Sequence, residues 1–384
     1  MEKKRLGDIC EIVTGATPKT NIKEFWDGDI NWITPAELTE DTYIINESLR
    51  KITTEGVEKT GLKSFPKGTV ILSSRAPIGK VAIAGCEMYC NQGFKNLVCS
   101  KQINNRFLYW YLKGHKEYLN SLGRGATFKE ISKAIVENIE ICLPTLEKQE
   151  KYADILEQCN GIIQIKKGQL RKLDTLVKSR FAEMFGDPIR NPKGWKVVTI
   201  GDIVTEVRYG TSKPAVEGGK YPYLRMNNLT ADGHLDLNDL KYIDISDDEV
   251  EKCVVRKGDV LFNRTNSIDL VGKTAVFDLQ DDMVIAGYII RVRLNEKILP
   301  EVLSQYMNLE ALKDILRSMA KGAVNQANIN AQELQSIRVY VPDIELQKQF
   351  VEMKDQVDKL KSKIQKSLEE TQLLFDSLMQ KYFG

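Results

Sequence analysis

Residues 345–383 read ELQKQFVEMKDQVDKLKSKIQKSLEETQLLFDSLMQKYF, a stretch with neither glycine nor proline. Its apolar residues recur at steps of three and four, the heptad pattern of a helix that packs along one seam. The seam positions are Phe350, Met353, Val357, Leu360, Ile364, Leu374 and Leu378, with polar Ser367 and Thr371 between them. At 1.5 Å per residue the helix is about 57 Å long, and a single apolar seam of that length needs a partner. The sequence therefore predicts a long helix that packs against another.

Residues 147–185 carry a second copy of this pattern, ahead of Gly186 and Pro188, which form a common helix stop. Its apolar positions are Tyr152, Ile155, Cys159, Ile163, Leu170, Leu173, Val177 and Met184. Gly161 and Gly168 lie inside this copy, and each costs a helix about 1 kcal/mol relative to alanine. We expect a bend or a close contact with a partner at these glycines. Because each helix can supply the partner that the other needs, the two are predicted to form an antiparallel coiled coil.

The helices belong to a larger internal repeat, because the rest of the chain also matches itself in order. The matched segments are 5–9 with 199–203, 66–70 with 256–260, 79–80 with 272–273, 93–94 with 287–288, and 125–126 with 322–323. Pro144, Glu147 and Gln149 match Pro342, Glu345 and Gln347 at the same spacing. So many ordered matches indicate a duplication in which each copy ends in one long helix.

The part of each copy that precedes its helix has the pattern of a mixed module. In the first copy, residues 69–72 and 81–84 are short β-branched runs near glycine turns, which predicts strands. Residues 107–119 carry apolar side chains at helical spacing and predict a helix. The sequence therefore predicts an α+β fold, with two pseudo-repeated modules separated by two long antiparallel coiled-coil helices. The predicted boundaries are 1–146, 147–186, 187–344 and 345–384.

Composition limits the kind of protein. The chain of 384 residues is 42% hydrophobic and 28% charged, as is usual for globular proteins. No apolar run approaches the ~20 residues that span a bilayer, and no signal peptide precedes the folded sequence, so a cytoplasmic protein without a membrane partner is expected. Seven irregularly spaced cysteines argue against a disulfide framework. Cys86 and Cys90 lack the further ligands of a zinc site, so no metal is expected.

The net charge of +2 is low for a protein that binds nucleic acid through charge alone, and neither half of the chain is strongly basic. A DNA-binding function would need locally clustered basic residues, or a partner that supplies much of the phosphate contact. Charge therefore neither predicts nor excludes DNA as a ligand.

Short motifs also occur in order in the two copies. They are LGDI at 6–9 with TGATP at 14–18, Trp195 with GDI at 201–203, LSSRAPIGK at 72–80, LFNRTN at 261–266 with VGK at 271–273, NQGF at 91–94, and RF at 180–181 with MFGD at 184–187. Together these motifs resemble those of the specificity subunits of Type I restriction-modification systems. The resemblance covers essentially the whole chain, and the order of the motifs makes it specific, although each motif alone is weak.

The resemblance implies that each module is a target-recognition domain that reads one half of a split target in double-stranded DNA, with the helices fixing the gap. It implies two methyltransferase subunits as partners, which bind S-adenosylmethionine and carry the chemistry, so no cofactor is expected in this chain. It also implies two restriction subunits that cleave and translocate DNA, and the sequence leaves open whether they accompany this chain. Two similar modules on an antiparallel helix pair have a pseudo-two-fold axis, which suits duplex DNA and a symmetric pair of partners.

Sequence readout needs arginine or lysine for guanine and asparagine or glutamine for adenine. We expect such side chains at strand ends and in glycine-bounded loops. The candidates in the first module are Arg75, Lys80, Arg124, Thr127 and Lys129. The candidates in the second module are Arg225, Asn227, Asn228, Arg264, Asn266, Lys273, Lys321, Asn325, Gln326 and Asn328. Each of them could instead be a turn former or a solvated loop residue.

Residues that both copies share suit phosphate contact or architecture, and residues that differ suit specificity. Arg75 and Arg264 recur in both copies, so a structural role stays open for them. The loop 123–129 is basic, whereas its counterpart 321–328 is rich in amides. These two loops are therefore predicted to carry the specificity.

The chain lacks a recognisable catalytic motif and is predicted not to be an enzyme. Its two histidines, His115 and His234, have no histidine counterpart in the other copy, which disfavours a hydrolytic triad. Residues 15–20 lack the glycine that precedes the lysine of a phosphate loop, and no dinucleotide-binding motif follows a strand. Asp259 and Asp269 have no counterparts that would support a nuclease site. The alternative to DNA reading is a non-catalytic coiled-coil scaffold that joins two protein-binding modules.

Overall fold

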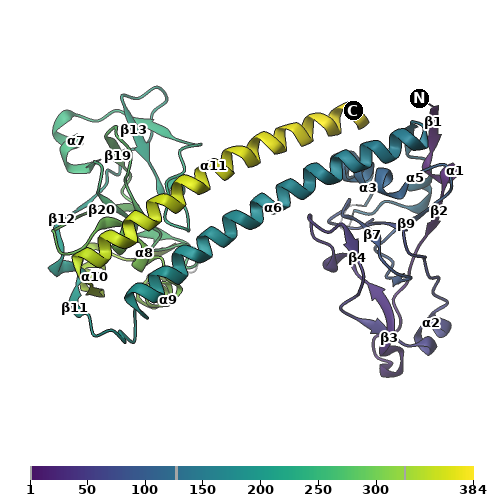
Figure 1. Ribbon diagram of the computed structural model, residues 1–384, viewed down its shortest axis with the longest axis horizontal. Coiled ribbons are helices and arrows are strands. Elements are labelled where there is room, and N and C mark those ends of the chain that lie inside the picture. The colour runs from purple at the N-terminus through teal and green to yellow at the C-terminus, as the bar shows by residue number, and fades with distance from the viewer. Residues whose placement is uncertain (1, 126–128, 324–325) are drawn as a thin grey trace. The chain divides into compact units, whose positions relative to one another are not determined.

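The computed structural model describes residues 2–125, 129–323 and 326–384, and the chain divides into two compact units (Figure 1). Unit 1 contains Met1–Lys167 and Lys366–Gly384, and unit 2 contains Gly168–Gln365. Both divisions fall inside long helices, α6 (Leu146–Phe185) and α11 (Ile344–Phe383). Each unit therefore combines one mixed module with half of each long helix.

Unit 1 is built on a sheet whose strand order is β2-β9-β6-β7-β4. Its strands are β2 (Cys10–Val13), β9 (Asn96–Cys99), β6 (Val70–Leu72), β7 (Val81–Ala84) and β4 (Ile44–Ile45). Smaller sheets join β5 (Lys51–Ile52), β3 (Trp26–Ile33) and β8 (Tyr89–Cys90), and β1 (Glu2–Arg5) with β10 (Glu140–Leu143). The strands predicted at 69–72 and 81–84 are confirmed as β6 and β7, and every residue of both is buried.

The helices of unit 1 pack on these sheets and on one another. They are α1 (Leu6–Ile9), α2 (Thr54–Thr60), α3 (Asn105–Gly114), α4 (Lys116–Leu122) and α5 (Lys133–Glu137), with 3-10 turns η1 (Lys23–Phe25) and η2 (Pro35–Glu37). The prediction of one helix over 107–119 is wrong, because α3 and α4 meet at His115. The ring of His115 bonds the Tyr111 carbonyl at 2.8 Å, and its backbone leaves helical geometry at ψ 25°. A side chain that competes for backbone groups favours such a break.

Unit 2 repeats this plan with two larger sheets and a small three-strand one. Their orders are β12-β20-β16-β18, β14-β13-β19-β15 and β17-β22-β21, and β11 pairs with β23. The strands are β11 (Lys196–Thr199), β12 (Val204–Tyr209), β13 (Tyr221–Leu224), β14 (Lys241–Ile243), β15 (Val254–Val255), β16 (Val260–Asn263), β17 (Thr265–Asn266), β18 (Thr274–Val276), β19 (Met283–Ile285), β20 (Ile289–Leu294), β21 (Lys321–Ala323), β22 (Gln326–Asn328) and β23 (Arg338–Val341).

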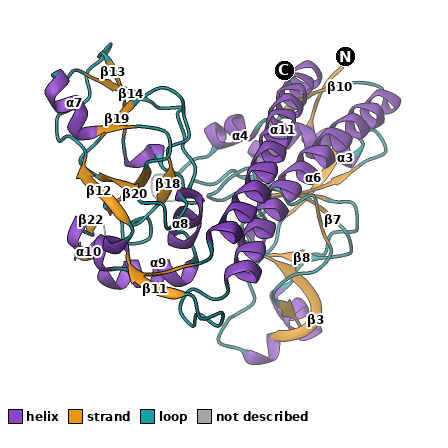
Figure 2. Cartoon of the chain, turned by 60° about the vertical axis from the view of Figure 1, so that its left-hand side comes forward, coloured by secondary structure: helices purple, strands orange, loops and turns teal. Residues whose placement is uncertain are grey.

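The helices of unit 2 pack on these sheets, and Figure 2 shows α8 beside β18. They are α7 (Asp247–Cys253), α8 (Pro300–Met307), α9 (Glu310–Met319) and α10 (Ala331–Ser336), with 3-10 turns η3 (Ile200–Asp202) and η4 (Met226–Asn228). The mixed content of both units agrees with the predicted α+β class.

A buried glutamine near the start of each long helix makes the same contacts in both units. The Gln149 amide donates to the Pro144 carbonyl at 2.9 Å, and its oxygen accepts from the Asn104 backbone at 2.8 Å. The Gln347 amide donates to the Pro342 carbonyl at 2.8 Å, and its oxygen accepts from the backbone of Leu299, also at 2.8 Å. Both glutamines are fully buried. The proline and glutamine spacing that marks the sequence repeat is therefore a structural anchor between helix and module.

The long helices run antiparallel within each unit. In unit 1 the rings of Tyr152 and Tyr382 stack at 3.9 Å, and Lys166 farther along α6 donates to the Ser367 carbonyl, earlier on α11. In unit 2, Phe181 on α6 packs against Phe350 on α11 with ring centroids 5.3 Å apart. The predicted antiparallel pairing is confirmed within both units.

The seam of α11 differs from the predicted heptad. Leu360 and Leu374, two predicted seam residues, are exposed, whereas Phe375, outside the predicted seam, packs edge-on against Trp110 of α3. The predicted seam is therefore wrong at Leu360 and Leu374. Near Leu374 the reason is that the C-terminal end of α11 packs Phe375 on the module as well as Tyr382 on α6. Gly161 and Gly168 lie in continuous helix, and a Cβ added to either would meet no atom of the described residues within 4 Å, apart from the adjoining backbone of its own helix. The expected close contact is therefore not with α11.

Among the residues that the structure describes, no helix combines the length and apolar character needed to cross a membrane.

Candidate nucleic-acid interface

In unit 1, three backbone segments meet in a short strip just beyond β6. Antiparallel bridges join Arg75 to Glu130 and Glu130 to Arg124. Side chains directly opposite each other on antiparallel segments project to the same face. Arg75, Glu130 and Arg124 therefore form one row of charged side chains, which we call row 1.

Row 1 is held together by charge-assisted hydrogen bonds. Arg75 Nε donates to Glu130 Oε2 at 2.9 Å, and Lys95 Nζ donates to Glu130 Oε1 at 3.2 Å. Lys95 is buried and also donates to Ser74 Oγ at 3.2 Å. Burial raises the pKa of Glu130, but the hydrogen bonds from Arg75 and Lys95 outweigh it and hold this pKa below its usual value. Glu130 is therefore a carboxylate whose two oxygens are both engaged.

Unit 2 has the same strip, formed by β17, β22 and β21. Asn328 of β22 lies opposite Thr265 of β17 on one side and Lys321 of β21 on the other. Thr265, Asn328 and Lys321 form row 2. Arg264 Nη2 donates to Asn328 Oδ1 at 3.0 Å, and the Arg264 guanidinium lies 4.9 Å from the centre of the Tyr209 ring. An amide and a lysine thus stand where row 1 has a carboxylate and an arginine.

Backbone hydrogen bonds establish which residues of the two strips correspond. The N–H of Ile131 donates to the Ser74 carbonyl, and the N–H of Ile329 donates to the Arg264 carbonyl, both at 2.9 Å. Ser74 therefore corresponds to Arg264, and Arg75 corresponds to Thr265. The pairing of Arg75 with Arg264 made from the sequence is wrong by one position. Sequence matching aligned the two identical side chains, whereas the backbone hydrogen bonds determine which residues occupy equivalent positions in the two modules.

Lys80 and Lys273 hold a turn inside their own units. Lys273 Nζ donates to the carbonyls of Met226 and Leu229, at 2.8 and 2.5 Å. Lys80 Nζ makes equivalent contacts, at 3.3 and 2.6 Å, with the carbonyls of Pro35 and Leu38. Burial lowers the pKa of Lys273. Both ammonium groups are thus engaged by the protein itself.

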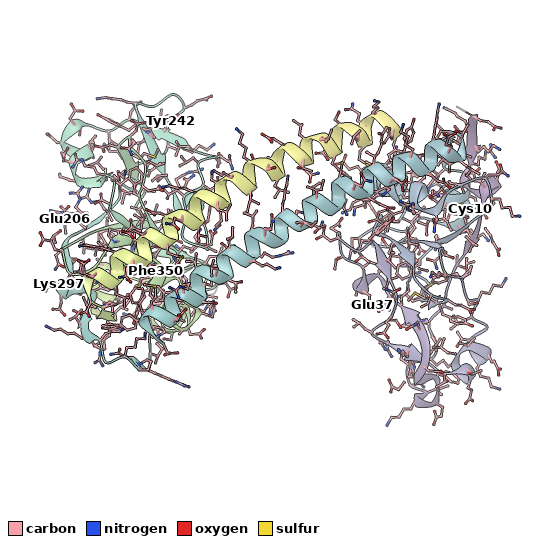
Figure 3. All side chains as sticks on the ribbon, in the orientation of Figure 1. Cys10, Glu37, Glu206, Tyr242, Lys297 and Phe350 are labelled. Carbon is pink, nitrogen blue, oxygen red and sulfur yellow. The ribbon has the colours of Figure 1, made fainter. Side chains whose placement is uncertain are left out.

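The candidates at η4 lie in one capped turn. Asn228 is buried, with Oδ1 accepting from the Arg225 N–H and Nδ2 donating to the Asp236 carbonyl, both at 2.8 Å. The Arg225 guanidinium pairs with Asp239 at 2.7 Å. Asn227 is exposed. In unit 1 the counterpart of the Asn228 cap is Glu37, labelled in Figure 3, whose carboxylate accepts from the Thr34 N–H at 2.7 Å.

The remaining candidates lie near the two rows. Lys129 and Gln326 are exposed, and Lys321 pairs with Glu333 at 2.5 Å. The Asn266 amide donates to Asn263 Oδ1 at 2.9 Å. Thr127 and Asn325 lie outside the described residues. The structure therefore brings Arg75 and Arg124 together in unit 1, and Arg264, Asn266, Lys321, Gln326 and Asn328 together in unit 2.

Three residues of these clusters were missed from the sequence: Glu130, Lys95 and Tyr209. Glu130 was missed because a carboxylate repels DNA by its charge. Lys95 was missed because it follows an apolar segment that is typical of a buried strand. Tyr209 is distant in sequence from the arginine it faces. Only the position of Glu130, six residues after the flagged Arg124 and at the end of the flagged loop, could have drawn attention to it.

We also searched the described part of the chain for a metal site, for nuclease carboxylates and for a reactive thiol. No group of three or more histidine, cysteine, aspartate or glutamate side chains there is arranged to hold a metal ion. Asp259 caps the Arg256 N–H at 2.9 Å and binds Arg293 Nε at 2.9 Å, which is a structural role. Burial raises the pKa of Cys90 to about 12. That thiol accepts a hydrogen bond from Asn96 at 3.1 Å.

Two modules of one plan, each bearing a polar row at the same place but with different side chains, define a paired recognition protein with helical connectors. The family described as the Type I restriction modification DNA specificity domain matches residues 1–175 and 192–370, once in each copy. The chain belongs to this family.

Curated relatives agree with this membership. The chain is 38% identical over 248 residues to the Type I restriction enzyme MjaIX specificity subunit of Methanocaldococcus jannaschii, covering 59% of this chain and 57% of that protein. The match thus spans a little over half the length of that relative. Over 352 residues it is 25% identical to the EcoKI specificity subunit of Escherichia coli, covering 85% of this chain and 76% of that protein.

Solved structures share the fold. The S subunit of a Type I restriction-modification system from M. genitalium superposes with a TM-score of 0.60 at 14% identity, covering 100% of this chain and 96% of that one. A chain from a study of complex assembly in a type I R-M system gives 0.58 at 20% identity, covering 100% and 97%. At these identities the likeness concerns the fold.

Proposed function

We propose that this chain is the DNA specificity subunit of a Type I restriction-modification complex, in which each module reads one half of a bipartite target. The observation that carries the proposal is the pair of rows. Row 1 and row 2 occupy the same place in the two modules, yet they consist of Arg–Glu–Arg and Thr–Asn–Lys. A shared frame with exchanged side chains is what two half-sites of different sequence require.

The candidates divide into two roles on this proposal. Arg75, Arg124, Lys129, Asn266, Gln326 and Asn328 are at or beside the rows and face the DNA. Lys80, Lys273 and Asn228 instead stabilise the turns behind the rows, because their polar groups are already bound to backbone partners. If the ammonium group of such a lysine turned outward to contact DNA, two carbonyl oxygens would lose their hydrogen-bond donor, which is costly.

The helices set the gap between the half-sites. Each module is anchored to α6 or α11 by a buried glutamine, so the length of the helix pair determines how far apart the rows are held. Inserting four residues after Lys167 in α6 adds about 6 Å of helix, close to two base pairs at about 3.4 Å each. We expect the non-specific gap to lengthen while both half-sites keep their sequences.

Long-read mapping of methylated adenines in cells that carry the insertion variant and its methyltransferase tests this expectation. The substitution Gly168→Ala at the same site changes no length and serves as the control. An unchanged gap in the insertion variant, or a change in either half-site sequence, would contradict the role of the helices as spacers.

Two methyltransferase subunits are the partners that this proposal requires. They would bind S-adenosylmethionine, while this chain contributes no cofactor site and no catalysis, and the complex would work in the cytoplasm. Ile165 and Leu373 are exposed on the helix halves of unit 1, which supports docking of another protein there. Two restriction subunits would complete a cleaving complex. Co-purification of the full chain with its methyltransferase tests the partnership.

The second candidate function is a scaffold whose modules bind proteins. The engaged carboxylate in row 1 and the low net charge favour this scaffold. A gel shift at low salt, with and without the methyltransferase, separates the two. Sequence-selective retardation supports DNA reading, and binding that ignores sequence in both samples supports the scaffold.

A further inference from the structure

Row 1 holds one arginine in an orientation that fits a particular base. Arg75 Nε donates to Glu130 at 2.9 Å, and the two terminal nitrogens of Arg75 have no partner among the described residues. The side chain is 44% exposed. Resting on the proposed function, we propose that Arg75 reads a guanine in the half-site of the first module, with Glu130 and Lys95 as its positioning residues.

Guanine is the base that matches the free end of this side chain. With Nε engaged, the terminal nitrogens present two parallel N–H donors. In the major groove guanine offers two neighbouring acceptors, O6 and N7, whereas adenine offers one acceptor and one donor. The other two bases offer a single polar group there. Two parallel donors therefore select guanine over the other three bases.

The surroundings of Arg75 favour a base edge over a phosphate. The Glu130 carboxylate fixes Arg75 through Nε, so the two remaining donors are held side by side, an arrangement that two neighbouring acceptors on one base edge match. A phosphate contact would also suit both modules equally, because the DNA backbone is the same at both half-sites. The counterpart of Arg75 in unit 2 is Thr265, which is buried and cannot replace it.

Glu130 itself is not a base reader in this arrangement. One oxygen binds Arg75, and the other binds Lys95, whose ammonium is buried and also held by Ser74. A carboxylate fixed from two sides fixes the arginine in turn, so less side-chain entropy is lost when DNA binds. Lys95 also balances the carboxylate charge, which leaves the Arg75 charge available to the base.

Unit 2 uses its arginine in another way, which makes the assignment specific to the first module. The terminal nitrogen Nη2 of Arg264 donates to Asn328 Oδ1 at 3.0 Å, and the guanidinium lies over the Tyr209 ring. Its other terminal nitrogen, Nη1, donates to the Gly287 carbonyl at 3.5 Å, so both ends of the fork are engaged, whereas those of Arg75 have no partner among the described residues. The guanine preference should therefore appear in one half-site only.

The test uses the full chain in complex with its methyltransferase and duplexes that carry every single base-pair change in the mapped target. Competition binding at fixed salt gives the preference at each position. We expect Arg75→Met to reduce the preference for one G·C pair in one half-site by about tenfold or more, with the other positions unchanged. Glu130→Gln should weaken the same preference by a smaller factor and leave every other position unchanged, which a general loss of structure would not do.

Two further variants separate charge from readout. Arg75→Lys keeps the positive charge without the fork, so it should restore affinity on all duplexes but only part of the G·C preference. Lys129→Met removes an exposed positive charge next to Glu130 and leaves the Arg75 fork intact, so it shows how much the loss of charge alone changes the G·C preference. Intact selectivity at the second half-site shows that each variant is folded.

Uniform weakening by Arg75→Met, fully rescued by Arg75→Lys, would identify a phosphate contact and overturn the proposal. An unchanged preference at every G·C pair would overturn it as well. If the unsubstituted complex shows no sequence preference, the proposed function itself fails, and this outcome differs from both of the others.

Discussion

The buried Gln347 gives the sharpest prediction about stability. Its oxygen accepts from the Leu299 N–H at 2.8 Å, and its amide donates to the Lys297 and Pro342 carbonyls at 3.0 and 2.8 Å. Gln347→Leu keeps a similar volume but leaves three buried or partly buried backbone groups without partners. At about 1–1.5 kcal/mol each, the loss is about 3–4.5 kcal/mol, partly offset by the added apolar contact. We expect the free energy of unfolding of unit 2 to fall by about 3 kcal/mol.

Hydrogen exchange read by mass spectrometry in increasing urea measures each unit separately. Gln349→Leu is the matched control, because Gln349 is exposed two residues along the same helix, and we expect a change within about 0.5 kcal/mol. Gln149→Leu should destabilise unit 1 by a similar amount, since Gln149 makes the corresponding contacts. Equal effects of Gln347→Leu and Gln349→Leu on unit 2 would refute the view that the buried amide anchors helix to module.

Two more predictions concern a glycine pair and a histidine. Gly168→Ala should raise the melting temperature by stabilising α6 by about 1 kcal/mol, whereas Gly15→Ala should lower it, because its Cβ would lie 1.8 Å from the Cys90 carbonyl oxygen. Hydrogen bonds to Asp232 and then Asp358 raise the pKa of His234 to about 9, against burial. The stability of unit 2 that this histidine provides is therefore complete below about pH 6.5 and lost as the pH rises through about 9, and denaturation of His234→Gln should lack this loss.

The sequence predicted the architecture well because that architecture rests on local patterns. Heptad spacing predicts α6 and α11, and the shared Pro144 and Gln149 spacing is one of the ordered matches that predict the repeat. Strands β6 and β7 follow from short buried runs. The break at His115 could not be predicted, because a side chain bonding its own preceding turn leaves no mark in the apolar pattern.

The interface was predicted less completely. Arg75 and Arg124 could be identified from residue type and loop context. Their meeting across Glu130 depends on a strip whose segments are about 50 residues apart in the chain, and no periodicity records such a pairing. For the same reason the sequence matched Arg264 to Arg75, although the backbone places Arg264 with Ser74.

The two long helices show what the sequence alone determines and what depends on the tertiary structure. The sequence by itself determined that there are two of them, where they start and end, and that each closes one copy of a repeat, because helix formation and capping depend on near neighbours. The tertiary structure decided which faces they bury and which polar side chains form each row. Leu360 and Leu374 are exposed, and Glu130 lies between two arginines, because burial and pairing are properties of distant segments that pack together.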